Sequence, residues 1–358
     1  MEEYKENEVF VDFASYRHYW RGIPKIGKTT LFRDIVLEAY GHQRYGLLIS
    51  AGIETGYKAL NRIFAKEAPT WERFVEIVDD LVENRENNTF KVVAIDTVDE
   101  LVSIASDKVL KIHFQQKGER AQSLNASLGG YGQGHIKVAS LINEQIHKLE
   151  LAGYGLVFIS HTKVKDVKEK GMEESYQQLT SNMESRFDNI FSKKADIIAT
   201  LYLEKKAADN KLIETQRYIY FRGDNFIDAG SRFPGIPEHV EMSAKNYLEA
   251  FEKGVKSSLE TDISEKELEK RKQKEIEKRE VSAKEYIAKA KTGDVESANT
   301  LKTPEDYHTL INQRIKELDK EVKKQKQEEL KEKGVPTNFK EVEDIEVLKT
   351  ILKVVSGE

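Results

Sequence analysis

The chain has 358 residues, of which 33% are charged, and a formal net charge of −5. This length allows one large domain with an appendage or two domains, while the net acidity excludes a globally basic surface, so nucleic-acid binding would need a local basic patch. The chain has no cysteine, which excludes disulfides, thiolate metal sites and cysteine nucleophiles.

The first residues, MEEYKENEVF, lack the basic and apolar regions of a signal peptide. No apolar run approaches the roughly 20 residues that a membrane span needs. We therefore expect a cytoplasmic protein without membrane contact.

Short apolar runs alternate with helical stretches through the first two thirds of the chain, which is typical of a parallel sheet flanked by helices. The first candidate strand, Ser15–Trp20, is aromatic and polar where a buried central strand is usually aliphatic. The clearer strands are Tyr45–Ser50, Phe90–Asp96, Gly155–Ser160, Ala195–Leu203 and Arg217–Arg222, and the helices include Thr29–Tyr40, Thr70–Asn84 and His135–Leu151. The pattern predicts an α/β core over residues 1–250, with strands covered on both faces.

The composition changes from about Val255 onward. Glu265–Glu280 is nearly all charge of alternating sign, which favours a solvated helix or spacer over a DNA-binding arm. Thr303–Asp306 has the spacing of a helix capping box. Apolar residues follow at helical spacing: Tyr307, Leu310, Ile311, Leu318, Val322, Ile345, Leu348, Leu352 and Val355. Residues 251–358 are therefore expected to form a charged helical appendage that packs weakly or makes an oligomer contact.

Between the first strand and the first helix lies GIPKIGKT, which has the spacing of the phosphate-binding loop. Its glycines allow the backbone amides to point inward around phosphates at the start of a helix. Lys28 is expected to reach the β- and γ-phosphates, and the Thr29 hydroxyl to bind Mg²⁺. We thus expect ATP and Mg²⁺ as cofactors. The nucleotide-binding residues are expected to be Gly22, Ile23, Pro24, Lys25, Ile26, Gly27, Lys28, Thr29 and Thr30.

The second half of such a site is an acidic residue at the end of an apolar strand. Asp96 stands there in KVVAID, where it would hold Mg²⁺ through water. The alternative is a strand-end aspartate that caps the next helix. The pairing of Asp96 with the upstream loop favours the metal role.

Hydrolysis also needs a residue that activates water. Thr97 follows Asp96 directly, where many nucleotide-driven proteins have glutamate, and Asp99 and Glu100 come slightly later. Glu54 lies just beyond another apolar run, in a glycine-containing segment, from which a carboxylate can reach the γ-phosphate water. Glu54 is the favoured catalytic base, and a turn residue is the alternative.

Six stretches together resemble a known family: GIPKIGKTTL, LLISAGIETGYKAL, VVAIDT, LGGYGQG, FISHTK and FRGDNFIDAGSRFPGIP. They are similar to the phage-encoded RecA-like ATPases, often described as AAA-family phage nucleotide-binding proteins, which include the Sak-type recombination ATPases. The resemblance covers roughly Tyr16 to Pro237 and leaves out the charged C-terminal third.

The resemblance implies a RecA-type core in which a strand is added between the phosphate-loop strand and the Asp96 strand. It places the catalytic glutamate at the end of that added strand, at Glu54. It also implies a polar γ-phosphate sensor at the end of the next sheet strand, at His161. From the residues alone, His161 is equally well a strand-end histidine bonded to backbone.

The resemblance further implies hydrolysis coupled to single-stranded DNA, with a DNA contact in the loop after the sensor strand. That stretch carries Lys163, Lys165, Lys168, Lys170 and Tyr176. Lysines neutralise phosphates and an aromatic ring stacks on bases, but acidic residues interrupt the patch, and a solvated loop is the alternative. A second candidate is the glycine-rich segment 129–137 with Tyr131, whose alternative is a helix-entry loop.

Arg222 and Arg232 are candidates for the arginine that a neighbouring subunit supplies to the phosphates, with Arg232 favoured. Local pairing with Asp224 or Asp228 is the alternative. We expect self-association into a ring or filament, single-stranded DNA as a partner, and a phage recombination or single-strand-binding protein as a further partner. The leading hypothesis is a Mg²⁺-dependent DNA-linked ATPase, the second a nucleotide-dependent protein-interaction switch, and the least favoured a small-molecule kinase.

Overall fold

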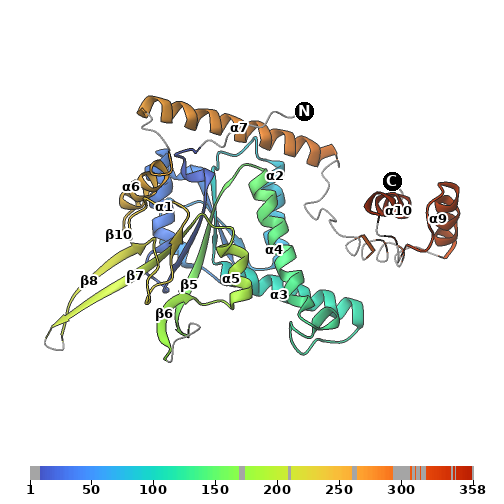
Figure 1. The fold of residues 1–358 in the computed structure, drawn as a ribbon, viewed down its shortest axis with the longest axis horizontal. Coiled ribbons are helices and arrows are strands. Elements are labelled where there is room, and N and C mark those ends of the chain that lie inside the picture. Colours follow the sequence, from blue (N-terminus) through green and yellow to red (C-terminus); the bar gives the residue numbers. More distant parts are fainter. Residues whose placement is uncertain are drawn as a thin grey trace. The chain divides into compact units, whose positions relative to one another are not determined.

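The structure is a computed structural model that describes residues 9–168, 174–208, 211–259, 264–292, 307–308, 311, 315, 320–339, 342 and 344–356. The chain divides into two compact units, Met1–Asp294 and Val295–Glu358 (Figure 1). Several positions singled out above lie outside the described residues, namely Lys170, Thr303–Asp306, Leu310 and Leu318.

The first unit is built on one sheet with the strand order β10-β8-β7-β1-β5-β4-β2-β3. The parallel strands are β7 (Ile197–Ala208), β1 (Arg17–Gly22), β5 (Gly155–Val167), β4 (Val92–Asp96), β2 (Gly46–Ala51) and β3 (Ala65–Ala68). Antiparallel pairings add β8 (Lys211–Tyr220), β10 (His239–Glu241), β6 (Tyr176–Ser181) and β9 (Gly230–Ser231). The predicted α/β class with a mainly parallel sheet is confirmed.

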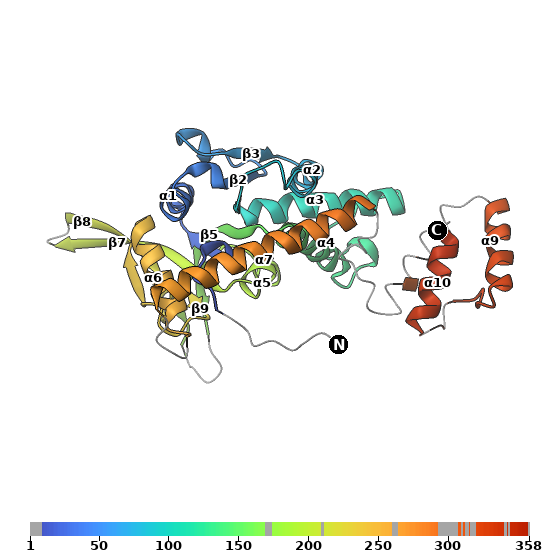
Figure 2. The ribbon, with the colours of Figure 1, turned by 90° about the horizontal axis from the view of Figure 1, so that it is seen from above.

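Helices cover both faces of the sheet (Figures 1 and 2). One face packs against α1 (Lys28–Tyr40) and α6 (Ala244–Lys256), and the other against α2 (Trp71–Glu83), α3 (Val98–Lys117), α4 (Gln133–Leu151) and α5 (Ser185–Ser192). Short 3-10 helices are Phe13–Ser15, Gln43–Tyr45, Gly56–Ala59 and Ser127–Gly129. Alternate residues of each strand enter opposite cores, as Val93 and Val92 do in β4, which explains the continuous apolar runs.

The aromatic, polar strand β1 lies at the centre of the sheet, between β5 and β7. Most of its polar side-chain groups are paired across the core. The Tyr247 hydroxyl is 2.8 Å from His18 Nδ1 and accepts from Trp20 Nε1 at 3.0 Å, while the Tyr19 hydroxyl donates to Asp188 at 2.8 Å. Burial lowers the pKa of His18 to about 4, so its imidazole is neutral at pH 7. A buried strand tolerates such residues when each polar group has a partner.

The charged helix α7 (Glu265–Thr292) belongs to the first unit. It runs along the amino ends of the strands (Figure 2), where Arg279 pairs with Asp12 at 2.9 Å. Two residues of α7, Ala283 and Ile287, are buried against the first unit, although most of the surface of this helix is exposed. The first unit therefore extends to Asp294, past the boundary at residue 250 suggested by the sequence, because α6 and α7 pack on the core.

The second unit contains α9 (Lys320–Glu332) and α10 (Ile345–Ser356). Its described residues include a small apolar core of Tyr307, Ile311, Leu330, Phe339, Leu348, Ile351, Val354 and Val355. Several residues of the predicted helical pattern are therefore core residues. Across the described parts of both units, no helix is long and apolar enough to cross a membrane.

Candidate active site

The register of the parallel strands brings the ends of four strands together at the carboxyl edge of the sheet. Gly22, the last residue of β1, lies opposite His161 of β5. Asp96, the last residue of β4, lies opposite Ile159 of β5 on one side and Ser50 of β2 on the other. Ligands of open α/β sheets bind at this edge.

The strand added between the phosphate-loop strand and the Asp96 strand is β5. The resemblance placed Glu54 at the end of that strand, but the residue that occupies this position is His161. Glu54 follows β2, which pairs with β4 on the side away from β5. The expected position was wrong because β2 lies between β1 and β4 in the chain but not in the sheet. The expected role of Glu54 as the catalytic base does not depend on which strand precedes it and stays a prediction.

The phosphate-binding loop joins β1 to α1. Gly27 has a φ of 111°, so its backbone conformation favours glycine, and a Cβ atom there would also lie close to Met242 Cε, at 3.1 Å. Lys28 Nζ donates to the backbone oxygens of Gly22 at 2.9 Å and Ile23 at 3.1 Å. Burial lowers the pKa of Lys28, and the nearby carboxylates, Asp96 first, act against this shift.

Thr29 and Asp96, the expected magnesium residues, are in direct contact. Thr29 Oγ1 donates to Asp96 Oδ2 at 2.7 Å. Burial raises the pKa of Asp96, while the Thr29 hydrogen bond and the Lys28 charge lower it. The described residues contain no cluster of three or more protein ligands for a metal. The Thr29 hydroxyl and the Asp96 carboxylate are oxygen ligands that fit Mg²⁺, which typically binds through one or two protein groups together with phosphates and water.

Three further acidic residues lie near this edge of the sheet, and they differ in their partners. Asp99 Oδ2 accepts from the backbone N–H of His161 at 3.1 Å, and its Oδ1 is buried without a partner among the described residues. Glu100 accepts a hydrogen bond from the backbone of Ile53. The half-buried Glu54 carboxylate has no hydrogen-bond partner in the part of the chain that the structure describes. Glu54 is therefore the carboxylate freest to bind water.

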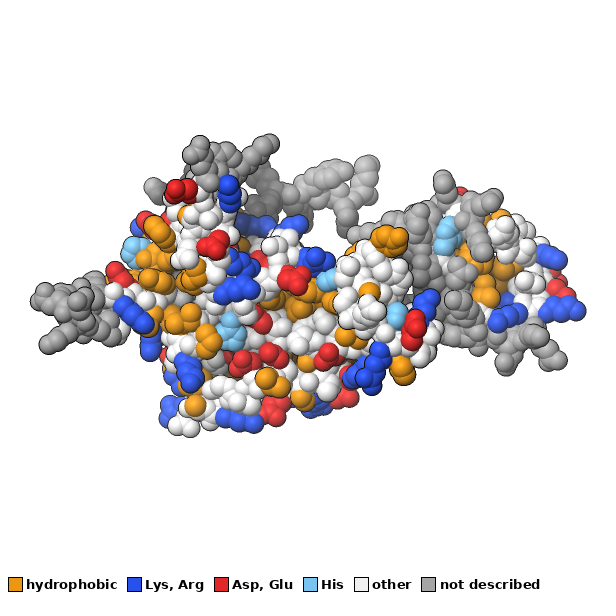
Figure 3. All heavy atoms as spheres, turned by 90° about the horizontal axis from the view of Figure 1, so that it is seen from below, with side chains coloured by type: hydrophobic (Ala, Val, Ile, Leu, Met, Phe, Trp, Pro, Cys, Tyr) orange, Lys and Arg blue, Asp and Glu red, His pale blue; other side chains and the backbone are white. Residues whose placement is uncertain are grey.

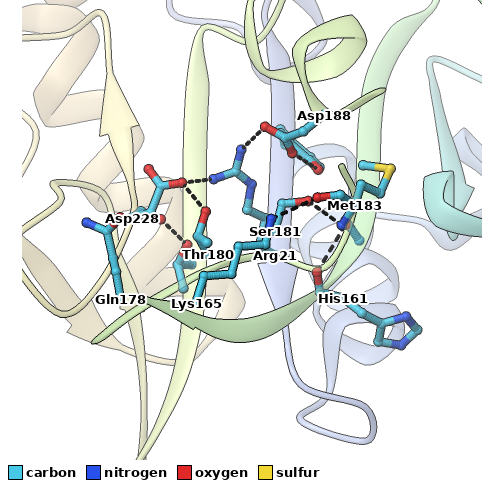
Figure 4. A network of polar contacts seen from close by, with 12 residues as sticks. Arg21, His161, Lys165, Gln178, Thr180, Ser181, Met183, Asp188 and Asp228 are labelled. Atoms are coloured by element: carbon cyan, nitrogen blue, oxygen red, sulfur yellow. Dashed lines mark hydrogen bonds and ion pairs between the residues drawn. The ribbon is translucent and has the colours of Figure 1, made fainter. Parts of the chain in front are cut away.

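His161 is half-buried at the end of the β5 segment that pairs with β1. Burial lowers its pKa, and the positive charge of Lys28 acts in the same direction, so the imidazole is neutral at pH 7. Its backbone oxygen accepts from the N–H of Asn182 at 2.9 Å. Figure 4 shows the ring pointing away from the polar network beside it, where it is available to a ligand.

Sequence reasoning missed Arg21, which directly precedes the phosphate loop. Its buried guanidinium donates to Asp228 at 2.6 Å and to Asp188 at 2.8 Å (Figure 4), and lies 4.6 Å from the centre of the Tyr19 ring. Thr180 of β6 donates to the same Asp228 oxygen at 2.6 Å. Burial acts to lower the pKa of Arg21, but its neighbours outweigh burial and raise it. Arg21 thus ties the strand before the loop to three other elements. The sequence signal was an arginine that directly follows the aromatic residues Tyr19 and Trp20 and directly precedes the loop.

The expected DNA-binding loop after β5 is largely a hairpin formed by β5 and β6. Lys163 and Lys168 are exposed on it. Lys165 instead donates to the backbone oxygen of Met183 at 2.8 Å, which draws its charge toward the Arg21 network (Figure 4). Among the described lysines of this stretch, two therefore remain available to a ligand.

The second expected contact segment joins α3 to α4. Tyr131 is 99% exposed there and has a φ of 51°, flanked by glycines in the same left-handed region. Figure 3, which views the molecule from the side of the carboxyl edge, shows lysine and arginine side chains interspersed with aspartate and glutamate. Any nucleic-acid contact here would rest on a few local residues.

Neither candidate arginine lies near the phosphate loop of its own chain. Arg222 donates to the backbone oxygens of Ile236, Phe233 and Pro234, which holds that turn. Arg232 is 60% exposed and lies 3.4 Å from Asp196. It follows β9, which pairs with the first residues of β7, so it lies at the amino edge of the sheet. Local pairing occurs for both, though not with the carboxylates expected.

No curated protein matches this chain. The model of a family described as AAA domain matches residues 14–233, which is more than half of the 358 residues. The matched region contains β1, the phosphate loop, Glu54, Asp96 and His161 and ends before α6. On this match and on its fold, the chain belongs to the AAA-domain family of nucleotide-binding P-loop ATPases.

Proposed function

We propose that the chain is a Mg²⁺-dependent RecA-like ATPase that acts on single-stranded DNA in phage recombination or replication. One observation carries the ATPase part of this proposal. Lys28 and Thr29 begin α1, Asp96 ends β4, Glu54 follows β2 and His161 lies in β5, and the strand register brings these segments to one edge of the sheet.

The proposed chemistry assigns one task to each group. The loop amides and Lys28 hold the phosphates, for which Lys28 must exchange its two backbone oxygens for phosphate oxygens. Thr29 and, through water, Asp96 would hold Mg²⁺, which would supply positive charge to neutralise the phosphates. Glu54 accepts a proton from the water that attacks the γ-phosphorus as the bond to ADP breaks, and neutral His161 donates a hydrogen bond to the γ-phosphate.

The DNA part of the proposal rests on two segments that extend from the same edge. Lys163 and Lys168 on the hairpin supply positive charge for phosphates, and the fully exposed Tyr131 supplies a ring for stacking on a base. A phage recombination or single-strand-binding protein is proposed as a further partner. Both proposals rest on the family resemblance as well as on these residues.

Self-association into a ring or filament is proposed from the position of Arg232. This exposed arginine lies at the edge opposite to its own phosphate loop, so it can reach only the nucleotide of a neighbouring copy. Its ion pair with Asp196 must break or rearrange for that contact to form.

The decisive experiment is ATP turnover by the full chain with Mg²⁺, with and without single-stranded DNA. We expect turnover that rises with DNA, and loss of nucleotide binding or turnover in Lys28→Ala, because the phosphates lose their buried cation. Wild-type activity in Lys28→Ala would refute the whole site. Turnover that ignores DNA, together with no DNA binding at low salt, would reject the DNA role and favour a nucleotide-dependent protein-interaction switch.

A further inference from the structure

The hairpin of β7 and β8 continues past the level at which β1 ends. Gly22 is paired with Leu201 of β7, and β7 runs on to Ala208 beside β8. Arg217 of β8 pairs with Leu203, two residues beyond Leu201. The Leu203–Arg217 pair therefore lies beyond the carboxyl end of β1, at the level of the phosphate loop.

The face of the hairpin on which Arg217 lies follows from the alternation of its strand. Ile219, two residues further along β8, is buried in the same core as Ile26 and Leu31 of the phosphate loop and α1. Arg217 lies on this face because side chains two apart in a strand point the same way. A Cβ atom on Gly27 would lie 4.0 Å from Arg217 Nη1, which locates the guanidinium against the loop itself.

The charge around the loop is uneven. Asp96, Asp99 and Glu54 all act on Lys28 from the side of β4 and β2, so the carboxylates near the loop outnumber this buried cation. The exposed Arg217 guanidinium, on the opposite side, has no hydrogen bond or ion pair within the described part of the chain. A nucleotide's phosphate chain would approach this loop against the negative charge on one side.

We propose that Arg217 binds the phosphate chain of the nucleotide in cis, from the side of the loop opposite Asp96. The inference rests on the proposed nucleotide-binding function. It adds Arg217 to Lys28 as a second positively charged side chain that contacts the phosphates. It assigns Arg217 a role in affinity, which differs from the role in trans proposed for Arg232. An arginine suits this task because its planar group donates several hydrogen bonds to phosphate oxygens.

The test is calorimetric titration of the full chain with Mg-ATP at low and high potassium chloride. Arg217→Met should weaken binding about 10- to 100-fold at low salt, the usual value of a charge-assisted hydrogen bond, and less at high salt, where screening reduces the lost attraction. Arg217→Lys should recover part of the affinity. Arg44→Met, which removes another exposed arginine just before β2 at the amino edge, should bind as wild type does.

An Arg217→Met variant that binds Mg-ATP like wild type would overturn the inference. A loss of equal size at both salt concentrations would also overturn it, because it would indicate a contact with the base or ribose. Wild-type protein that fails to bind Mg-ATP would refute the proposed function itself, a result distinct from either. Thermal unfolding of each variant checks that the fold is kept, as expected for an exposed side chain.

Discussion

Replacing Arg21 by methionine should destabilise the first unit by about 3 kcal/mol, because two charged hydrogen bonds are lost and two carboxylates are left without their cation. The side chain of Arg21 is 2% exposed, whereas Asp188 and Asp228 are 16% and 38% exposed, so water compensates part of the loss. Arg17→Met is the matched control on the same strand. Arg17 also contacts two carboxylates, but at 3.4 Å each and with 34% of its side chain exposed, so its loss should cost less than about 1 kcal/mol.

Urea unfolding followed by tryptophan fluorescence measures this difference. The chain has two tryptophans, Trp20 and Trp71, and both are buried in the first unit, so the signal reports that unit alone. Equal losses in the Arg21 and Arg17 variants would refute the reasoning, as would a loss below about 1 kcal/mol for Arg21→Met. Neutralising both partners with Asp188→Asn and Asp228→Asn should recover part of the stability of Arg21→Met.

Two predictions concern the nucleotide site. Glu54→Gln should bind ATP normally but hydrolyse it about 100-fold or more slowly in a single-turnover assay, and an unchanged rate would point to Asp99 or Glu100 as the base. The His161 pKa, measured by NMR titration, should lie below the ordinary value of 6.5. The unfolded chain then binds this proton more readily than the folded one, so the stability of the fold should decrease as the pH falls from 6.5 toward the lowered pKa. Lys28→Met should raise that pKa, since the Lys28 charge adds to the effect of burial, and an unaltered value would show that the two groups do not interact.

Local patterns predicted much of the first unit. The strands β2 and β4 and the helices α1, α2 and α4 were expected within about two residues of their bounds, because each has a clear apolar run or a helical repeat. β1 was expected from its place before the phosphate loop. Its hydropathy could not predict burial, because its hydrogen-bonding partners lie as far as 229 residues away, in the His18–Tyr247 pair.

The site residues that the sequence analysis misplaced or did not identify share one feature. Their surroundings depend on contacts between segments that are distant in the chain. Because β2 follows the phosphate-loop strand β1 in the chain, we expected it between β1 and β4 in the sheet. The strand in that position is β5, so Glu54, which follows β2, lies on the far side of β4. Arg21 and Arg217 received no site role because their neighbours come from parts of the chain that are distant in sequence. Motifs thus identified residues adjacent in sequence, and long-range pairing supplied the rest.

The C-terminal region shows the limit of composition as a guide. Alternating charge in α7 indicated a solvated helix, and most of its surface is exposed as expected. Ala283 and Ile287 nevertheless pack it onto the core, and Arg279 pairs with Asp12. A few well-spaced apolar residues are enough to dock a helix that is otherwise polar.

The long-range partners of β1 have a consequence for the order in which the protein is made. Strand β1 emerges from the ribosome before its partners, because Arg21 pairs with residues 167 and 207 positions later, and Trp20 with one 227 later. Contacts between such distant positions form late because closing long loops costs entropy. Although its motif is synthesised before the partners of β1, the nucleotide site is therefore among the last parts of the first unit to become complete.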